Sequence, residues 1–313
     1  MVTKISIIGT GRHSKILQKL CKKIDGVYLD YLFSRNKKKI KGSKVTNLYE
    51  DILQSNVIFI CVPPNLNLDI ILKLIKLNYK NYIVCEKPVL TSKNQLIKFN
   101  KISSKIKKKI FVNFHFEYTK LASLMKHELK NKLNGKFKFA EFHVSHGSAW
   151  LKRWNNEWRL KSKLGPIENT AIHYLHYFKK IFGKFELLSK SLNGIKKYKV
   201  DTSNIFIKFK KKYIFLRFSY SEPYNIFFQM IFDNAKIIYN GRIFKYYFKR
   251  NTFDKNGRFI EPKLKKSFSI KYYKDWENSI FKNLKNIFKI IKLNKYNNLK
   301  NLKNDTTILN KFY

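Results

Sequence analysis

The sequence has 313 residues, of which 44% are hydrophobic, and this length suits two domains or one large domain with a real core. Its three cysteines, Cys21, Cys61 and Cys85, have no paired spacing, which argues against a disulfide framework or a zinc site. The amino terminus lacks a charged segment followed by a long apolar run, and later apolar runs are interrupted by lysine well short of a membrane span. We therefore expect a cytoplasmic protein with reduced cysteines and no membrane association.

The charge of the chain is extreme, because 66 Lys and Arg residues against 20 Asp and Glu residues give a formal net charge of +46. Taken alone, this charge suggests nucleic acid or an acidic membrane surface as a partner. However, Lys, Asn, Ile, Phe and Tyr, whose codons are rich in A and T, are all abundant, and the lysine runs are scattered over every region. Lysines also outnumber arginines, although bidentate phosphate and base recognition favours arginine. Genome composition explains this better than a binding face does, so we expect no nucleic-acid partner.

Strand and helix patterns alternate over the first 118 or so residues. Apolar runs predict strands at 4–9, 27–33, 56–62, 82–87 and 109–116. Helical spacing between them predicts helices at 13–24, 68–78 and 92–106. The continuous apolar run at 56–62 is typical of a parallel strand buried on both faces. The alternation predicts an α/β domain over 1–118, built on a doubly wound parallel sheet of the Rossmann type.

The pattern changes after about Tyr118. A helix is predicted over 119–132, a long strand over 136–147 and a second helix over about 167–181. Alternating strands are predicted over 204–221, 225–234 and 235–249, the last with a hairpin signal at Asn240-Gly241. These patterns predict a second, α+β domain over 119–313 with a mostly antiparallel sheet. Its C-terminal helices, over 276–294 and 306–313, could pack back on the first domain.

A glycine-rich turn follows the first predicted strand. "IIGTGRHS" places Gly9, Thr10, Gly11, Arg12 and His13 between that strand and the next helix. A tight turn needs one residue without Cβ, close approach of a pyrophosphate needs another, and the helix N-terminus stabilises the negative charge. The third position of the G-x-G-x-x-G pattern is occupied by Ser14, a small residue. In this βαβ context the turn predicts dinucleotide binding.

The end of the second predicted strand is where such folds select their cofactor, and it reads "FSRN". An acidic residue there would accept hydrogen bonds from the ribose hydroxyls of NAD. Ser34 and Arg35 instead offer a donor and a cation, which suit a 2'-phosphate. We therefore expect NADP or NAD, with NADP slightly favoured; the alternative is that Arg35 is one more solvated basic residue.

Several segments together resemble one family. "IIGTGR", "VIFICVPPNLNLDIILKLIK", "YIVCEKPV", "VNFHFEY" and "WRLKSKLGPIENTAIHYLHYF" resemble the Gfo/Idh/MocA oxidoreductases, the family of glucose-fructose oxidoreductase and inositol dehydrogenase. The Glu-Lys-Pro tripeptide at the end of a strand is the most specific single mark. The resemblance implies that the cofactor contacts further residues after the third and fourth strands of the first domain, which are Val62, Pro63, Pro64, Asn67, Glu86 and Lys87.

The resemblance also implies catalytic roles. Lys87 would lie beside the nicotinamide and the reacting carbon, and His173 would exchange a proton with the substrate hydroxyl or carbonyl. Physical chemistry agrees, because hydride transfer from an alcohol needs a proton acceptor and a positive charge near the developing alkoxide, and histidine titrates near neutrality. Glu86 would orient and neutralise Lys87. The aspartate expected one helical turn before His173 is Asn169, which can hold the imidazole but supplies no negative charge.

Three further interpretations complete the site. Arg159 and His176 are predicted to contact the substrate. A metal site built from His143, His146, His173 and His176 is not favoured, because 143 and 146 face opposite sides of a strand and no carboxylate or cysteine spacing supports the set. The outer face of the second sheet would need covering, so a homodimer or homotetramer is expected, as the resemblance also implies.

The residues therefore favour an NAD(P)-dependent oxidoreductase acting on CH-OH groups. It would transfer a hydride between the cofactor and a secondary alcohol or ketone of a sugar, sugar derivative or nucleotide sugar. One alternative is a family member that binds cofactor or ligand without turnover, which Asn169 motivates. The other, less favoured, is a basic nucleic-acid-binding protein.

Overall fold

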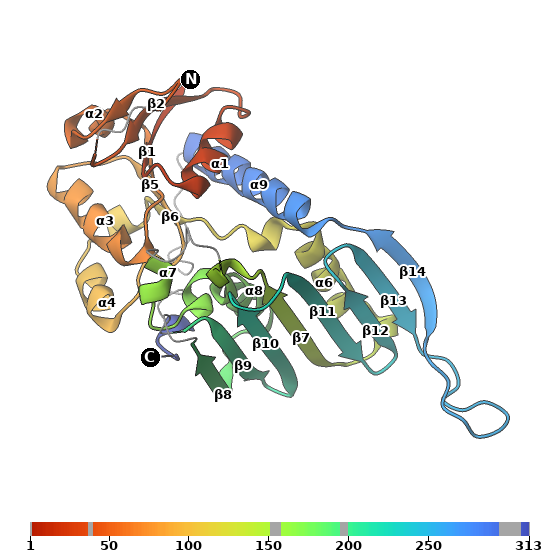
Figure 1. Cartoon of the computed structure of the whole chain (residues 1–313). Helices are drawn as coiled ribbons and strands as arrows, with labels where there is room; N and C mark the ends of the chain where they lie inside the picture. The colour runs from red at the N-terminus through yellow and green to blue at the C-terminus, as the bar shows by residue number, and fades with distance from the viewer. Residues whose placement is uncertain (1, 37–39, 151–157, 195–199, 294–307, 313) are drawn as a thin grey trace. The chain divides into compact units, whose positions relative to one another are not determined.

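The computed structural model describes residues 2–36, 40–150, 158–194, 200–293 and 308–312 (Figure 1). The chain divides into two compact units. Unit 1 comprises Met1–His115 and Ile280–Asn310, and unit 2 comprises Phe116–Ser279 and Lys311–Tyr313. Within the described ranges, no helix combines the length and the apolar character needed to cross a bilayer.

Unit 1 is built on a six-stranded sheet in the order β3-β2-β1-β4-β5-β6, and every neighbouring pair is parallel. This order is that of the doubly wound dinucleotide-binding fold, so the predicted fold class of the first domain is confirmed. The strands are β1 (Thr3–Ile8), β2 (Val27–Phe33), β3 (Val45–Thr46), β4 (Val57–Ile60), β5 (Tyr82–Cys85) and β6 (Ile110–Val112).

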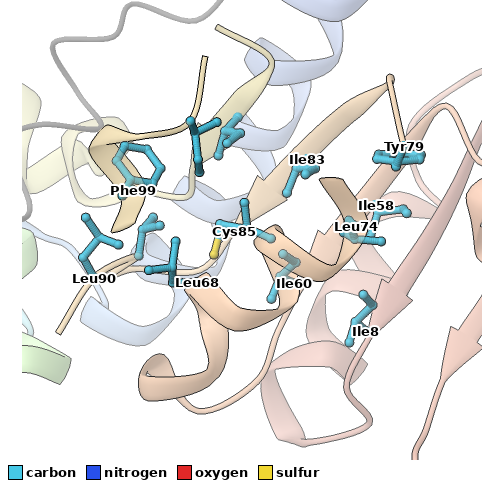
Figure 2. Packing of buried hydrophobic residues seen from close by; sticks show 14 of the residues in the cluster. Ile8, Ile58, Ile60, Leu68, Leu74, Tyr79, Ile83, Cys85, Leu90 and Phe99 are labelled. Atoms are coloured by element: carbon cyan, nitrogen blue, oxygen red, sulfur yellow. The ribbon is translucent and has the colours of Figure 1, made fainter. Parts of the chain in front are cut away.

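Helices cover both faces of this sheet, as the apolar pattern of β4 shows. All four residues of β4 are buried. Ile58 and Ile60 belong to a cluster with Leu68 of α3 (Figure 2), while the ring of Phe59 lies 6.0 Å from that of Phe288 in α9. The helices of unit 1 are α1 (Arg12–Cys21), α2 (Tyr49–Leu53), η1 (Pro64–Leu66), α3 (Asn67–Lys76), α4 (Lys93–Asn100), α5 (Ser104–Lys107) and the part of α9 (Tyr272–Lys292) from Ile280 onward.

Unit 2 is built on an eight-stranded sheet in the order β14-β13-β12-β11-β7-β10-β9-β8. Its neighbouring pairs are antiparallel except β7 with β10, which confirms the predicted mostly antiparallel sheet. The strands are β7 (Phe137–Ser145), β8 (Glu186–Asn193), β9 (Thr202–Phe209), β10 (Lys212–Ser219), β11 (Asn225–Phe232), β12 (Ala235–Tyr239), β13 (Ile243–Phe248) and β14 (Lys263–Ser269).

One face of this sheet packs against helix α8. Phe142 of β7 lies with its ring centroid 5.6 Å from that of Tyr174 and 5.0 Å from that of Phe178, both in α8. Buried and half-buried residues alternate along β9 and β11, as expected for a sheet covered on one side. Among the described residues, the helices of unit 2 are η2 (Phe116–Tyr118), α6 (Lys120–Lys130), η3 (Lys132–Asn134), η4 (Ser148–Trp150), α7 (Trp158–Lys161), η6 (Ile167–Ala171), α8 (Ile172–Phe182) and the part of α9 up to Ser279.

The strands that the sequence patterns missed lie at sheet edges. β8 and β14 end the eight-stranded sheet, and β3 ends the six-stranded one. β8 ("ELLSKSLN") and β14 ("KLKKSFS") are mostly exposed and rich in lysine and serine. Edge strands tolerate such residues, and charged edges discourage pairing with other chains, so they lack the alternation that identifies inner strands.

Candidate active site

The glycine turn after β1 depends on Gly9 for a packing reason. Gly9 has a φ of 110°, and a Cβ at this position would lie 2.2 Å from the carbonyl oxygen of Cys61 at the end of β4. The amide of Gly9 donates to the carbonyl of Phe33, at the end of β2, over 3.1 Å. The turn is therefore fitted between the ends of the two neighbouring strands, and only glycine satisfies both constraints.

Gly11 has a different place in the same turn. It caps the N-terminus of α1 with a φ of −73°, and a Cβ at this position would have no other atom within 4 Å. Arg12, the first residue of α1, is exposed. Ser14 is fully buried, and its hydroxyl accepts a hydrogen bond from Gln18 at 3.2 Å, so a small packed residue stands at the third position of the fingerprint. The open side of Gly11 and the free amides of a helix N-terminus form a cradle that fits a pyrophosphate.

The Glu86-Lys87-Pro88 turn follows β5 and is held from behind by Asn67. The Asn67 side-chain amide donates to the carbonyls of Glu86 (3.0 Å) and Pro88 (2.8 Å), and the Lys87–Pro88 peptide bond is cis. Asn67 is fully buried. Asn67 therefore positions the tripeptide, and its contact with the cofactor stays a prediction. The remaining residues of the loop, Val62, Pro63 and Pro64, follow β4 at the same edge of the sheet.

Glu86 is the centre of a polar network. His13 Nε2, in the first turn of α1, donates to its carboxylate at 2.9 Å, and the Asn113 amide donates at 2.5 Å. Asn283 of α9 in turn donates to Asn113 Oδ1 at 2.6 Å. The network ties the helix that caps the glycine turn to the Glu-Lys-Pro turn. His13, predicted as a cofactor contact, therefore also links these two parts of the candidate site.

The electrostatics of this network keep Glu86 ionised. Burial raises the pKa of Glu86, but the charges of His13 and Lys87 and hydrogen bonds from His13 and Asn113 outweigh it and lower the pKa to about 2. Burial lowers the pKa of His115 to about 3. The charge of Glu86 raises this pKa, and the charges of His13 and Lys87 lower it further. The ionised carboxylate of Glu86 and the partly exposed ammonium of Lys87 follow β5, and the neutral imidazole of His115 follows the neighbouring strand β6.

The predicted cofactor-selecting residues follow β2. The amide of Ser34 donates to the carbonyl of Thr46 in β3 at 2.8 Å. Arg35 is exposed, and its charge opposes the rise that burial causes in the pKa of Tyr49. The side chain of Arg35 is thus accessible at the carboxyl end of β2, where it can meet an anion.

In unit 2, His173 lies near the start of α8, directly after η6, a single π-helical turn. Its ring is buried and meets the ring of Trp276 edge-on at 5.0 Å. His176 is also buried, and burial together with Lys180 and Lys179 lowers its pKa to about 3. His176 is therefore a neutral imidazole packed within unit 2, and its contact with a substrate stays a prediction.

The other predicted residues of unit 2 gather around Tyr220. Burial raises the pKa of Tyr220 to about 12, although the charge of Arg159 and hydrogen bonding by Asn169 and Thr170 lower it. His146 stacks on Tyr220 at 5.1 Å and has a pKa of about 4, lowered by burial and by Arg159. Arg159 and Asn169 are therefore brought together, with Tyr220 as their shared neighbour.

The two histidines of β7 and the segment after it have separate hydrogen-bond partners. His143 forms hydrogen bonds with Glu222 at 2.7 Å and Asn225 at 3.0 Å, whereas His146 forms one with Ser148 at 2.6 Å. In the part of the chain that the structure describes, no three His, Cys, Asp or Glu side chains are grouped to hold a metal ion.

Residues 3–114 match the family model described as "Oxidoreductase family, NAD-binding Rossmann fold", that of the Gfo/Idh/MocA proteins. Over these residues, about a third of the chain, the protein is similar to the Gfo/Idh/MocA oxidoreductases. The resemblance seen in the sequence is thereby confirmed. A search of curated proteins finds no match to this chain.

Solved structures of Gfo/Idh/MocA type are similar to almost the whole chain. KijD10, a 3-ketoreductase from Actinomadura kijaniata in complex with NADP and TDP-benzene, has a TM-score of 0.80 and 11% identity, and the match covers 99% of this chain and 96% of that one. An oxidoreductase from Agrobacterium radiobacter in complex with NAD+, L-tartaric acid and magnesium has a TM-score of 0.76 and 14% identity, covering 97% and 93%. A myo-inositol dehydrogenase from Corynebacterium glutamicum has a TM-score of 0.72 and 10% identity, covering 98% and 95%. At these identities the likeness shows the shared fold.

Several residues that carried no motif of their own lie near the predicted ones in each unit. In unit 1 these are Asn113, His115 and Asn283. In unit 2 they are Glu168 and Tyr220, together with His146, which the sequence offered only as part of a disfavoured metal site. Glu168 is buried in η6, where its carboxylate accepts a hydrogen bond from Ser162 at 2.6 Å. Of these residues, only Asn113 and His115 could have been found from the sequence. They lie in "VNFHF", at the carboxyl end of a predicted strand, where ligands bind in such sheets.

Proposed function

We propose that this chain is an NAD(P)-dependent oxidoreductase that acts on a secondary alcohol or ketone of a sugar, sugar derivative or nucleotide sugar. The observation that carries the proposal is the network in which His13 joins the helix of the glycine turn to the Glu86-Lys87-Pro88 turn. The descriptions of KijD10 as a 3-ketoreductase and of another similar structure as an inositol dehydrogenase support this substrate class.

The cofactor is held by unit 1 in this proposal. The N-terminal amides of α1 and the open side of Gly11 receive the pyrophosphate, and Arg35 receives the ribose phosphate of NADP. When bound, the nicotinamide supplies or accepts the hydride. Lys87 places its positive charge where oxygen becomes negative as the carbonyl accepts a hydride, and so lowers the barrier.

His173 serves as the general acid and base in this proposal. A buried imidazole can give a proton to the forming hydroxyl and take it back in the reverse reaction. Asn169 offers hydrogen bonding without charge, so an imidazolium at His173 is less stabilised than one beside a carboxylate. The charge of Arg159 lowers the pKa of the nearby Tyr220, and the pair offers a cation and a hydroxyl to an oxygen-rich substrate.

Cofactor titration tests this function. NADPH is expected to bind with micromolar affinity and more tightly than NADH, and Arg35→Ala is expected to lower NADPH affinity about tenfold, since a charge-assisted phosphate contact is lost, with little effect on NADH. Fluorescence of the reduced nicotinamide measures both affinities, and a panel of sugars and nucleotide sugars then measures turnover. Failure to bind either cofactor would remove the proposal, and a preference for NADH would remove the NADP assignment alone.

We also propose that the outer face of the eight-stranded sheet pairs with a second copy. Phe206, Phe215 and Phe227 occupy half-buried positions of the inner strands β9, β10 and β11, on the face opposite Phe142 of β7. Glu141 and Gln229 join across the same face at 2.7 Å. Covering such aromatic surface stabilises an assembly, because apolar area is removed from water.

Phe215→Glu is expected to convert the oligomer to monomers, because it puts a charge in the centre of the proposed interface. Sedimentation velocity measures the mass, and Leu264→Glu on the exposed edge strand β14 is the matched control that should leave it unchanged. A monomeric unmodified protein, or an assembly that survives Phe215→Glu, would exclude this interface.

A further inference from the structure

Unit 2 contains a pocket that the proposed oxidoreductase site does not use. It has a volume of about 1070 Å³ and lies among α6, the second half of α8, the start of β7 and the turn between β9 and β10. The elements α6 and α8 are joined here, because the hydroxyl of Tyr177 donates to the carbonyl of Ala122. A pocket of this size can take a small molecule of the size of a nucleotide.

Lysine dominates the wall of this pocket, which we call the lysine pocket. Seven of its sixteen lining residues are lysines, about twice the share that Lys and Arg have in the whole chain (66 of 313), so composition alone does not explain them. The lining lysines are Lys126, Lys130, Lys136, Lys180, Lys210, Lys211 and Lys212. The carboxylate among the lining residues is Glu117, which is already paired with Lys180.

A second carboxylate near the lysine pocket is engaged elsewhere. Asp233 accepts a hydrogen bond from the backbone amide of Lys136 at 2.7 Å and pairs with Lys138, which is not a lining residue, at 2.7 Å. Hydrogen bonds from Lys138 and from the Lys136 backbone lower the pKa of Asp233. The carboxylate of Asp233 is therefore neutralised by Lys138, and the lysines of the pocket retain a large excess of positive charge.

Helix dipoles account for part of this arrangement. Lys130 and Lys180 lie in the last turns of α6 and α8, where the helix carbonyls favour cations. Lys136, the turn residues Lys210 and Lys211, and Lys212 at the start of β10 lie outside any helix. Lys210 moreover has a φ of 55°, a conformation that costs a side-chain-bearing residue free energy and that glycine adopts freely. A lysine at a position that favours glycine indicates a use for its charge.

We propose that the lysine pocket binds a small molecule carrying two or more linked phosphate groups. Lysines from four chain segments line the pocket, and their several ammonium groups match the charge of such an anion. Phe137 and Phe182, stacked at 5.6 Å, form an apolar wall, which strengthens charge pairing by excluding water. All lining residues belong to unit 2, so the proposal does not depend on the oxidoreductase activity.

Inorganic pyrophosphate is the probe, titrated calorimetrically into the full chain at fixed ionic strength. One site per chain is expected, and Lys210→Gly/Lys212→Gln is expected to weaken it about tenfold or more, since two charge-assisted contacts are lost. Lys263→Gln/Lys265→Gln, on the exposed strand β14 of the same unit, removes the same net charge and should change the affinity less than twofold. Absence of saturable binding, or equal weakening by both variants, would overturn the proposal.

Two further measurements separate this binding from its alternatives. Lys210→Gly alone should melt at or above the temperature of the unmodified protein, because glycine suits the backbone of the turn, so that lost binding cannot be attributed to misfolding. The titration is then repeated with saturating NADPH. Binding that NADPH abolishes and that Lys210→Gly/Lys212→Gln leaves intact would assign the pyrophosphate to the glycine turn of unit 1 and refute the lysine pocket.

Discussion

Gly9→Ala is expected to destabilise unit 1 by about 3 kcal/mol or more. The added Cβ would lie 2.2 Å from the carbonyl oxygen of Cys61, which is backbone and cannot rotate away, and the φ of 110° is one that alanine rarely adopts. Overpacking costs about 1–3 kcal/mol and a strained φ costs about 1–3 kcal/mol more. Thermal unfolding should show a melting temperature lower by about 6 °C or more.

Gly11→Ala is the matched control. Gly11 has a φ of −73°, and the added methyl group would have no other atom within 4 Å, so alanine should leave the stability unchanged or slightly higher. Under the proposed function it should still weaken NADPH binding, because the new methyl group occupies the open side of the cradle. An unchanged melting temperature for Gly9→Ala would contradict the packing at Cys61, and an unchanged NADPH affinity for Gly11→Ala would contradict the pyrophosphate cradle.

The two glycines also show what the sequence could predict about the turn. The G-x-G spacing after an apolar strand predicted the turn and its ligand class from local sequence alone. It did not distinguish the roles, because the role of Gly9 depends on Cys61, which lies more than fifty residues away and reaches Gly9 only through the pairing of β1 with β4. Local pattern finds the motif, and tertiary contact decides which glycine can be replaced.

Local sequence pattern likewise identified some strands and missed others. β4 was predicted because a strand covered on both faces must be apolar at every position. The inner strands of the second sheet were predicted from their alternation. β8 and β14 were missed, because a strand at an edge with exposed residues is held by backbone pairing to one neighbour and imposes little on its side chains.

The sequence indicated the motif residues of the candidate site but not the residues that contact them. Glu86 and Lys87 stand out because charges end an apolar run. Asn283 has no such signal, since it reaches Asn113 across 170 residues of sequence through the packing of α9. The π-helical turn before His173 was also not predicted, because a single wide turn leaves the apolar spacing of a helix almost intact. Asn169 was therefore assigned by α-helical spacing to His173, and its neighbour Tyr220 was missed.

Lys87→Met is expected to lower kcat about a hundredfold to a thousandfold on any substrate that the panel identifies. Removal of one preorganised group that stabilises a developing oxyanion has effects of this order. Methionine keeps the length and apolar stem of lysine, so the fold and the Asn67 contacts to the turn should persist. NADPH affinity and KM should change little, because the lost interaction strengthens in the transition state.

Lys80→Met is the control for Lys87→Met, since it removes the same charge from an exposed position shortly before β5 and should leave kcat unchanged. Steady-state kinetics, NADPH titration and thermal unfolding are measured for both variants. A kcat for Lys87→Met equal to that of the unmodified protein would exclude Lys87 as the electrophilic group. A protein that binds NADPH but turns over no member of the panel, with or without Lys87, would favour the alternative that this chain binds its cofactor without catalysis, because the network around Glu86 would then serve binding alone.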